Sequence, residues 1–185
     1  LDHPNIVKIN DFQIQDDGLF LIMEYVEGIP LNQYIKKKTG PIPEEKLKKL
    51  FLNVLSAIEY AHDNRIIHRD IKPSNILITK NETVKIIDFG IAKNSEVDVK
   101  LTKTGVQIGT VSYMSPEQIS AKKIDSTTDI YSLGVTLFEM ATGKGPYDGM
   151  TNSFEIQQKI VNEPLPDPKS IYPGISDKIT SIIEK

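Results

Sequence analysis

The chain has 185 residues, 39% hydrophobic and 25% charged, which is enough to bury the core of one globular domain and is not typical of disorder. The formal net charge of −3 gives no electrostatic reason to expect binding to nucleic acid or to an anionic membrane. The absence of cysteine excludes disulfides and thiolate zinc sites, and no apolar run approaches the length of a membrane span.

The first part of the chain predicts short strands. Residues 6–9 and 19–23 are β-prone runs, and the turn residues Asp16, Asp17 and Gly18 lie between them. Residues 24–28 then leave the second run as a connector. We expect these strands to be the remnant of a sheet at the N-terminal end of the domain.

Helices dominate the rest of the sequence. A helix is predicted from Pro43 to about Asn64, because apolar residues recur there at three- and four-residue spacing: Leu47, Leu50, Phe51, Val54, Leu55, Ile58 and Ala61. Residues 126–143 predict a second helix. Such a helix belongs in the middle of a helical body, because apolar residues lie around much of its circumference: Ile130, Leu133, Val135, Leu137, Phe138 and Met140. Further helices are expected at 153–161 and 176–185, and residues 76–87 predict a β-hairpin. The predicted class is α+β, mainly helical.

Three short motifs follow one another within fifty residues. The run from His68 to Asn75 reads His-Arg-Asp-Ile-Lys-Pro-Ser-Asn; Asp-Phe-Gly begins at Asp88, thirteen residues after Asn75, and Ser-Pro-Glu begins at Ser115. Asp70, Asn75 and Asp88 offer oxygen acceptors that can bind a hydroxyl proton and one or two hard cations. Transfer of a polyanionic phosphoryl group requires such a set.

The order and spacing of these motifs resemble the catalytic loop, metal-binding loop and closing tripeptide of the eukaryotic-type protein kinases. In that family a lysine followed by proline, as at Lys72-Pro73, marks serine/threonine kinases. The run Tyr-Met-Ser-Pro-Glu-Gln from Tyr113 is most similar to bacterial members. The resemblance implies a protein-kinase-like fold and transfer of the ATP γ-phosphate to serine or threonine of protein substrates, with Mg²⁺ as cofactor.

The resemblance implies a role for each residue of the catalytic set. Asp70 is expected to accept or orient the proton of the substrate hydroxyl, and Lys72 to neutralise charge on the transferred phosphoryl group. Asn75 and Asp88 are expected to bind Mg²⁺, which takes few protein ligands because the nucleotide phosphates supply the others. Each residue alone could equally belong to an ordinary surface turn.

The resemblance also implies where the nucleotide base binds. Met23 corresponds to the residue that controls access behind the adenine, and the backbone groups of Glu24 and Val26 are expected to hydrogen-bond the base edge. Leu77 and Leu31 are expected to form the apolar floor of the cleft. Taken alone, Met23 and Leu77 are as well explained by core packing.

Threonines between the second and third motifs indicate regulation. A phosphate on Thr102 or Thr104 would add negative charge that Arg69, beside Asp70, could pair with. The alternative is that both are ordinary loop residues. By resemblance, the hydroxyl of Thr110 is expected to bond the catalytic aspartate and lysine.

Other residues near the motifs are interpreted as structural. His68 and Phe89 are expected to be buried packing residues, with Ile9 as a third member of their contact, and Asp129 is expected to anchor the backbone near His68. Glu117 pairs with a late arginine in the resembling family. No arginine follows Arg69 in this sequence, so that partner is not expected here.

The resemblance covers only part of a kinase domain: residues 1–23 match the end of the small lobe, 24–30 the connector, and 31–185 a truncated large lobe. No Gly-x-Gly-x-x-Gly occurs in the chain, and the family's strand lysine is expected upstream. We therefore expect a fragment of a larger protein, inactive by itself. The catalytic domain is expected to be cytoplasmic, with any membrane anchor lying in parts outside this chain and with no nucleic-acid partner.

Two alternatives stay open. A pseudokinase or docking module would require the loss of a catalytic residue, and none of Asp70, Asn75 and Asp88 is lost. A kinase-like phosphotransferase acting on small molecules would share those residues. Such enzymes lack the Lys-Pro pair and the Ser-Pro-Glu tripeptide, both of which are present here.

Overall fold

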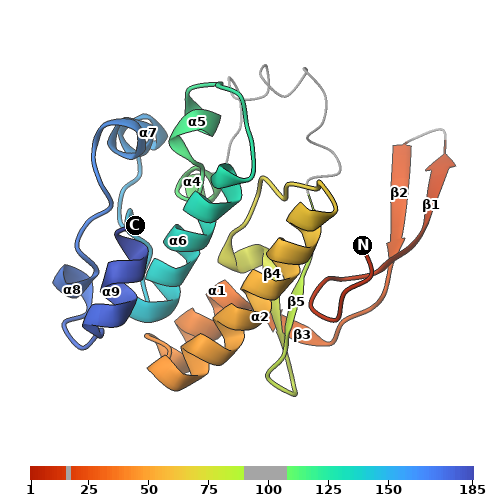
Figure 1. The fold of residues 1–185 in the computed structure, drawn as a ribbon, viewed down its shortest axis with the longest axis horizontal. Coiled ribbons are helices and arrows are strands. Elements are labelled where there is room, and N and C mark those ends of the chain that lie inside the picture. The colour runs from red at the N-terminus through yellow and green to blue at the C-terminus, as the bar shows by residue number, and fades with distance from the viewer. Residues whose placement is uncertain (16–17, 90–107) are drawn as a thin grey trace.

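The computed structural model describes residues 1–15, 18–89 and 108–185 of the chain. In this part a helical body carries a small sheet on one flank, and a separate hairpin stands away from it near the N-terminus (Figure 1). The predicted α+β class, mainly helical, is confirmed.

The separate hairpin pairs β1 (Ile9–Gln15) with β2 (Gly18–Met23) in antiparallel register. The predicted strand at 6–9 is therefore misplaced. Ile6 forms only a parallel bridge with Ile86 and is 3% exposed, because this segment packs on the other sheet and into the main core. Every residue of β1, in contrast, is exposed.

The second sheet has the order β3-β4-β5 and is antiparallel throughout. Its central and outer strands, β4 (Ile76–Thr79) and β5 (Val84–Ile86), are the predicted hairpin. The third strand, β3 (Gly28–Pro30), was not predicted, because three residues carry no periodicity. A side chain at Gly28 would meet the carbonyl oxygen of Ile78 at 2.9 Å, so this close pairing requires glycine.

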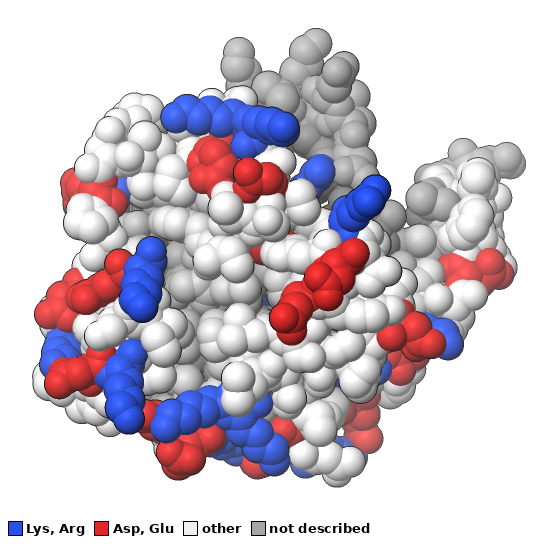
Figure 2. Space-filling model, viewed as in Figure 1, with Lys and Arg blue, Asp and Glu red and all other residues white. Residues whose placement is uncertain are grey.

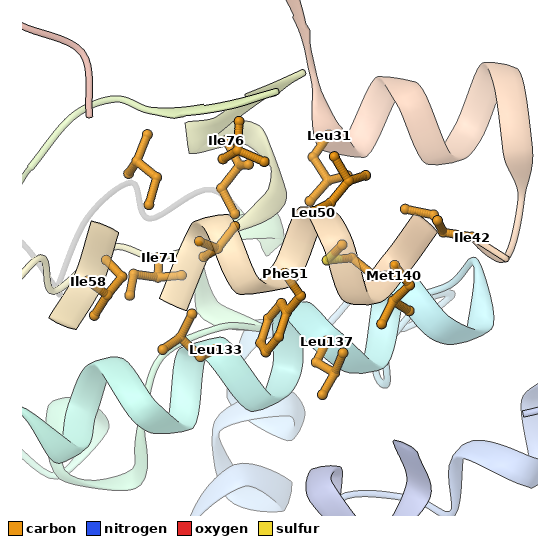
Figure 3. Packing of buried hydrophobic residues seen from close by; sticks show 14 of the residues in the cluster. Leu31, Ile42, Leu50, Phe51, Ile58, Ile71, Ile76, Leu133, Leu137 and Met140 are labelled. Carbon is orange, nitrogen blue, oxygen red and sulfur yellow. The ribbon is translucent and has the colours of Figure 1, made fainter. Parts of the chain in front are cut away.

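Two helices form the centre of the body: α2 (Glu44–Asp63) and α6 (Thr127–Thr142). Both match the predicted ranges within a residue or two. Gly143 ends α6 in the left-handed region, at a φ of 79°, and a side chain there would also collide with Pro41. Their facing side chains interdigitate (Figure 3), and this contact includes Leu50, Phe51 and Ile58 of α2 and Leu133, Leu137 and Met140 of α6.

Two residues expected to face inward do not. Leu55 of α2 is 37% exposed, and Ile130 in the first turn of α6 is 59% exposed. The remaining predicted apolar positions on the two helices are buried. Helical spacing locates the buried face correctly but not its edges, which depend on where the neighbouring elements end.

Two further helices confirm the sequence predictions: α7 (Ser153–Asn162) and α9 (Asp177–Ile183), with Asn152 and Ser176 as their N-caps. Single-turn elements were not predicted, since they are too short to show a period. These are α1 (Leu31–Tyr34), which continues into a π-helical segment (Ile35–Thr39), a 3₁₀ turn (Pro73–Asn75), α4 (Ile108–Val111), α5 (Pro116–Ile119) and α8 (Pro168–Ile171).

The charged side chains are interspersed. On the face seen in Figure 2, lysine and arginine alternate with aspartate and glutamate, and no large field of one sign covers it. Within the described ranges, no helix is both long and apolar enough to cross a bilayer.

Candidate active site

Asp129, in the first turn of α6, anchors the loop that carries the catalytic motif. Its carboxylate is fully buried; Oδ2 accepts the backbone N–H of His68 and Oδ1 that of Arg69, both at 2.8 Å. His62 Nε2 lies 2.8 Å from Oδ2 and completes the set. The expected anchoring role of Asp129 is confirmed. It also supports Arg69 in the left-handed region, at a φ of 65°, which a non-glycine residue adopts only when its surroundings hold it.

His68 is a buried packing residue, as predicted. Its ring lies 4.5 Å from the ring of Phe89, Nε2 donates to the carbonyl of Ile87 at 3.1 Å, and Nδ1 accepts the N–H of Asp70 at 3.3 Å. Burial lowers the pKa of His68, which agrees with a neutral ring that donates at one nitrogen and accepts at the other. The expectation that Ile9 is buried with them is wrong, because Ile9 is 41% exposed on β1.

The catalytic loop brings four predicted residues together. Lys72 Nζ lies 2.9 Å from Asp70 Oδ2 and donates to Thr110 Oγ1 at 3.2 Å. Asn75 Nδ2 donates to Asp70 Oδ2 at 3.1 Å and to the Asp70 carbonyl at 2.9 Å. The Asp70 carboxylate thus has a fixed orientation although its side chain is 19% exposed, so it can still meet a substrate. Thr110 reaches this set from α4 and contacts Lys72, one of the two partners that the resemblance implied.

Asp88 lies on the neighbouring loop, which two backbone contacts of Ile87 hold in place. The Ile87 N–H donates to the Asn75 carbonyl at 3.0 Å, and the Ile87 carbonyl accepts from the His68 ring. Asp88 itself is exposed and adopts a φ of 58°. The left-handed backbone turns the chain here, at the end of the buried strand β5.

The chemistry of Asn75 and Asp88 fits a magnesium ion shared with a nucleotide. The amide nitrogen of Asn75 is engaged by Asp70, so its oxygen Oδ1, which also accepts the Ser74 hydroxyl at 3.4 Å, is the atom that can face a cation. Among the described residues, no group of three or more histidine, cysteine, aspartate or glutamate side chains could hold a metal alone. A pair of oxygen donors suits a cation that takes its other ligands from phosphates and water.

The connector places the residues expected at the adenine site along the end of β2. Met23 is 42% exposed, Glu24 and Val26 are half-buried, and Leu77 is half-buried on β4. Leu31 is fully buried in the main core and has no surface to offer a ligand, so its expected place in the floor of the cleft is wrong.

The Ser-Pro-Glu motif forms the start of α5, and the residue that follows it, Gln118, contacts the catalytic loop. Ser115 and Gln118 make a capping box, and Gln118 Nε2 also donates to the Arg69 carbonyl at 2.9 Å. Glu117 accepts the hydroxyl of Thr128 at 2.6 Å. Burial raises the pKa of Glu117, but the bonds from Thr128, from its own backbone N–H and from Ser115 together outweigh burial, so the pKa lies below its ordinary value. A hydroxyl therefore holds Glu117 where the resembling family has an arginine.

Two sets of residues were missed by sequence reasoning. Tyr113 donates through its hydroxyl to the carboxylate of Glu139, and its carbonyl accepts the Ser132 hydroxyl at 2.8 Å. Ser132 and Glu139 are seven residues apart and therefore lie on one face of α6. This spacing was the available signal that the two polar side chains share a partner. The second set is Lys85 on β5 and Glu24 of the connector, whose side chains bond each other. The alternation of residues along a strand does not indicate which distant residue a lysine will meet. The candidates Thr102 and Thr104 lie outside the described residues.

Comparison with known proteins agrees with this geometry. The protein kinase domain family matches residues 1–185. The chain belongs to the protein kinase domain family. It is 40% identical over 185 residues to serine/threonine-protein kinase PrkC of Bacillus subtilis, and 37% identical to the probable serine/threonine-protein kinase PknB of Lactococcus lactis. It is 34% identical to the serine/threonine-protein kinase PknB of Mycobacterium leprae.

Each of these three comparisons covers all of this chain but only 28–30% of the length of the relative. The chain therefore spans less than a third of the length of the curated relatives it matches. The similarity to bacterial serine/threonine kinases that the motifs indicated is confirmed.

Proposed function

We propose that the full-length protein transfers the γ-phosphate of ATP to serine or threonine hydroxyls of protein substrates. The observation that carries the proposal is the connected set Asp70–Lys72–Thr110. The Lys72 ammonium lies 2.9 Å from the Asp70 carboxylate on its own loop and 3.2 Å from the Thr110 hydroxyl on a distant segment. Phosphoryl transfer depends on such positioning and charge stabilisation more than on covalent chemistry.

Each residue has a role in this proposal. Asp70 accepts or orients the proton of the attacking hydroxyl, and Lys72 neutralises charge on the transferred group. Thr110 fixes Lys72 by accepting a hydrogen bond from its ammonium group. When bound, Mg²⁺ neutralises the nucleotide phosphates, and Asn75 Oδ1 and the Asp88 carboxylate are the atoms that would hold it.

The nucleotide base is proposed to bind along the connector. The backbone groups of Glu24 and Val26 would hydrogen-bond its edge, Met23 would limit access behind it, and Leu77 would provide an apolar surface below it. We further propose that residues 1–23, 24–30 and 31–185 are small-lobe, connector and large-lobe parts of one kinase domain. The proposed location of that domain is the cytoplasm, where ATP is available.

The substitution Asp70→Asn tests the reaction, because asparagine keeps the shape of the side chain and loses its basicity. In the full-length protein, transfer of radiolabelled phosphate from ATP to a generic basic protein is expected to fall by at least about a hundredfold. The matched control is Asp63→Asn, which changes an exposed carboxylate at the end of α2.

Equal transfer by the Asp70→Asn variant and the unmodified protein would refute the assignment. Nucleotide binding without any transfer by the unmodified protein would instead indicate a docking module. Phosphate transfer to small molecules but to no protein would indicate the small-molecule phosphotransferase.

A further inference from the structure

Lys85, which pairs with Leu77 of β4, connects three segments of the chain beside the proposed nucleotide site. Its Nζ bonds the carboxylate of Glu24 and donates to the carbonyl of Ile6 at 3.3 Å. Its side chain is 21% exposed and that of Glu24 is 33% exposed, so solvent screens the pair only in part. Lys85 lies three residues before Asp88, on the strand that leads to the metal-binding loop.

The segment beneath this pair is tied to the same strand by its backbone. The N–H of Ile86 donates to the Asn5 carbonyl at 2.8 Å, and the N–H of Val7 donates to the Ile86 carbonyl at 2.9 Å. Asn5 Nδ2 also donates to the Val84 carbonyl at 2.8 Å. Residues 5–8 therefore form a fixed base, to which the connector is attached through Glu24.

Glu24 is held on this base at three points. Its N–H donates to the Lys8 carbonyl at 2.9 Å, its carboxylate accepts the Lys8 N–H at 3.0 Å, and the same carboxylate oxygen receives Lys85. The bond from Lys85, followed by the one from Lys8, holds the pKa of Glu24 below its ordinary value, so the carboxylate is charged at neutral pH. Because Lys8 engages the N–H, the backbone group that Glu24 can offer to a nucleotide is its carbonyl.

We propose that Lys85 is a positioning residue for the nucleotide, which acts by fixing Glu24 so that its carbonyl is oriented toward the base. This inference rests on the proposed function and adds a residue to it. In this proposal Lys85 acts on the nucleotide through the Glu24 carboxylate, not through a contact of its own. Losing the pair leaves the two bonds that Glu24 makes with the Lys8 backbone, one through its N–H and one through its carboxylate, so the connector stays folded but moves more freely. The ordered geometry then has to be recovered on binding, which weakens affinity for the nucleotide.

The test uses the full-length protein with Lys85→Met, which keeps the length of the side chain and removes its charge. Affinity is measured by titration with a fluorescent ADP analogue in the presence of Mg²⁺, and steady-state kinetics give KM for ATP, KM for the protein substrate, and kcat. We expect the ADP dissociation constant and KM for ATP to rise about three- to tenfold, the scale of one partly screened ion pair. KM for the protein substrate and kcat are expected to stay unchanged.

Three further variants separate positioning from general stability. Lys85→Arg keeps the charge and should restore most of the affinity. Lys80→Met removes a lysine from the turn of the same hairpin, where its partner Glu27 is 64% exposed and Lys80 is 75% exposed, and it should change nothing. Glu24→Gln keeps an acceptor for the Lys8 N–H and loses the charge, so it should reproduce the effect of Lys85→Met even if that variant fails to fold.

Unchanged nucleotide affinity in both Lys85→Met and Glu24→Gln would overturn the inference, as would an equal loss in Lys80→Met. Tighter binding or faster turnover in Lys85→Met would also overturn it, since the pair would then restrain the connector rather than prepare it. Failure of the unmodified protein to transfer phosphate would refute the proposed function while leaving the affinity comparison decisive for Lys85. If the unmodified protein bound no adenine nucleotide, both would be refuted.

Discussion

The backbone N–H of Ile87 donates to the carbonyl of Asn75 at 3.0 Å, which joins the loop before Asp88 to the catalytic loop. The two proposed ligands of magnesium therefore lie on backbone segments that are bonded to each other. The His68 ring holds the same residue from the other side, through the Ile87 carbonyl. Asp129 in turn fixes the backbone of His68, so the orientation of both loops is set by α6.

Replacement of Asp129 by alanine should strongly destabilise the domain. It leaves the buried N–H of His68 and that of Arg69 without their acceptor, and the loss of such a buried charged partner costs about 3–5 kcal/mol of the free energy of unfolding. Urea denaturation of the kinase domain measures this change. Asp63→Ala, at an exposed position, serves as the control, and a similar midpoint for both variants would show that the anchor has little energetic importance.

The contact between α2 and α6 predicts that two leucines on α2 differ greatly in their contribution to stability. Leu50 is 1% exposed and packs in the main core, whereas Leu52 is 63% exposed. Leu50→Ala should lower the free energy of unfolding by about 2–5 kcal/mol, through lost burial and a residual cavity. Leu52→Ala should change it by less than about 0.5 kcal/mol. Equal effects in chemical denaturation would contradict the packing of α2.

The contact between Tyr113 and Glu139 predicts a pH dependence of stability. Burial raises the pKa of Glu139, against the hydrogen bond from Tyr113 that lowers it, and nearby Asp148 raises it further. The folded state therefore binds the proton more tightly than the unfolded state. The contribution of this proton is fully present below the ordinary value of 4.5 and is lost as pH rises through the raised value in the folded protein.

Glu139→Gln should remove that dependence, because glutamine stays neutral. Unfolding in urea at several pH values should therefore show the unmodified domain losing stability relative to the variant as pH rises from about 4 toward neutrality. A difference between the two proteins that is constant over this range, or that changes in the opposite direction, would show that the Glu139 pKa is not raised.

Phosphorylation between the second and third motifs is predicted to raise activity through Arg69. Phosphate on Thr102 or Thr104 would present strong acceptors to a guanidinium beside the catalytic aspartate. Mass spectrometry of active full-length protein should find phosphate on one of these threonines. The double substitution Thr102→Ala/Thr104→Ala should lower kcat, and full activity in that variant would refute this form of control.

The isolated 185-residue chain is predicted to transfer phosphate poorly, because it contains no glycine-rich loop to cover the nucleotide phosphates. Its β1–β2 hairpin has every β1 residue exposed and stands apart from the helical body (Figure 1). A two-stranded hairpin is marginally stable in water, so its amides should exchange faster than those of α2 and α6. Turnover equal to that of the full-length protein, or slow exchange in the hairpin, would contradict this prediction.

The sequence by itself determined the family and the long helices, and it supplied the proposed catalytic residues. Each of these depends on residues that are close together in the sequence. Examples are the motif from His68 to Asn75 and the spacing of apolar residues along α2, which can be recognised without knowing what packs against them. The role of Asp129 could be predicted only by resemblance, since sixty residues separate it from the backbone that it holds.

The tertiary structure alone decided which distant segments meet. Residues 6–9 are predicted as a strand, yet Asn5 and Val7 bond Ile86 of β5, because burying Ile6 in the main core competes with pairing to β2. The same packing sets Lys85 against Glu24 across sixty-one residues and Tyr113 against Glu139 across twenty-six. No local pattern encodes such contacts, because each depends on how the elements on both sides are packed.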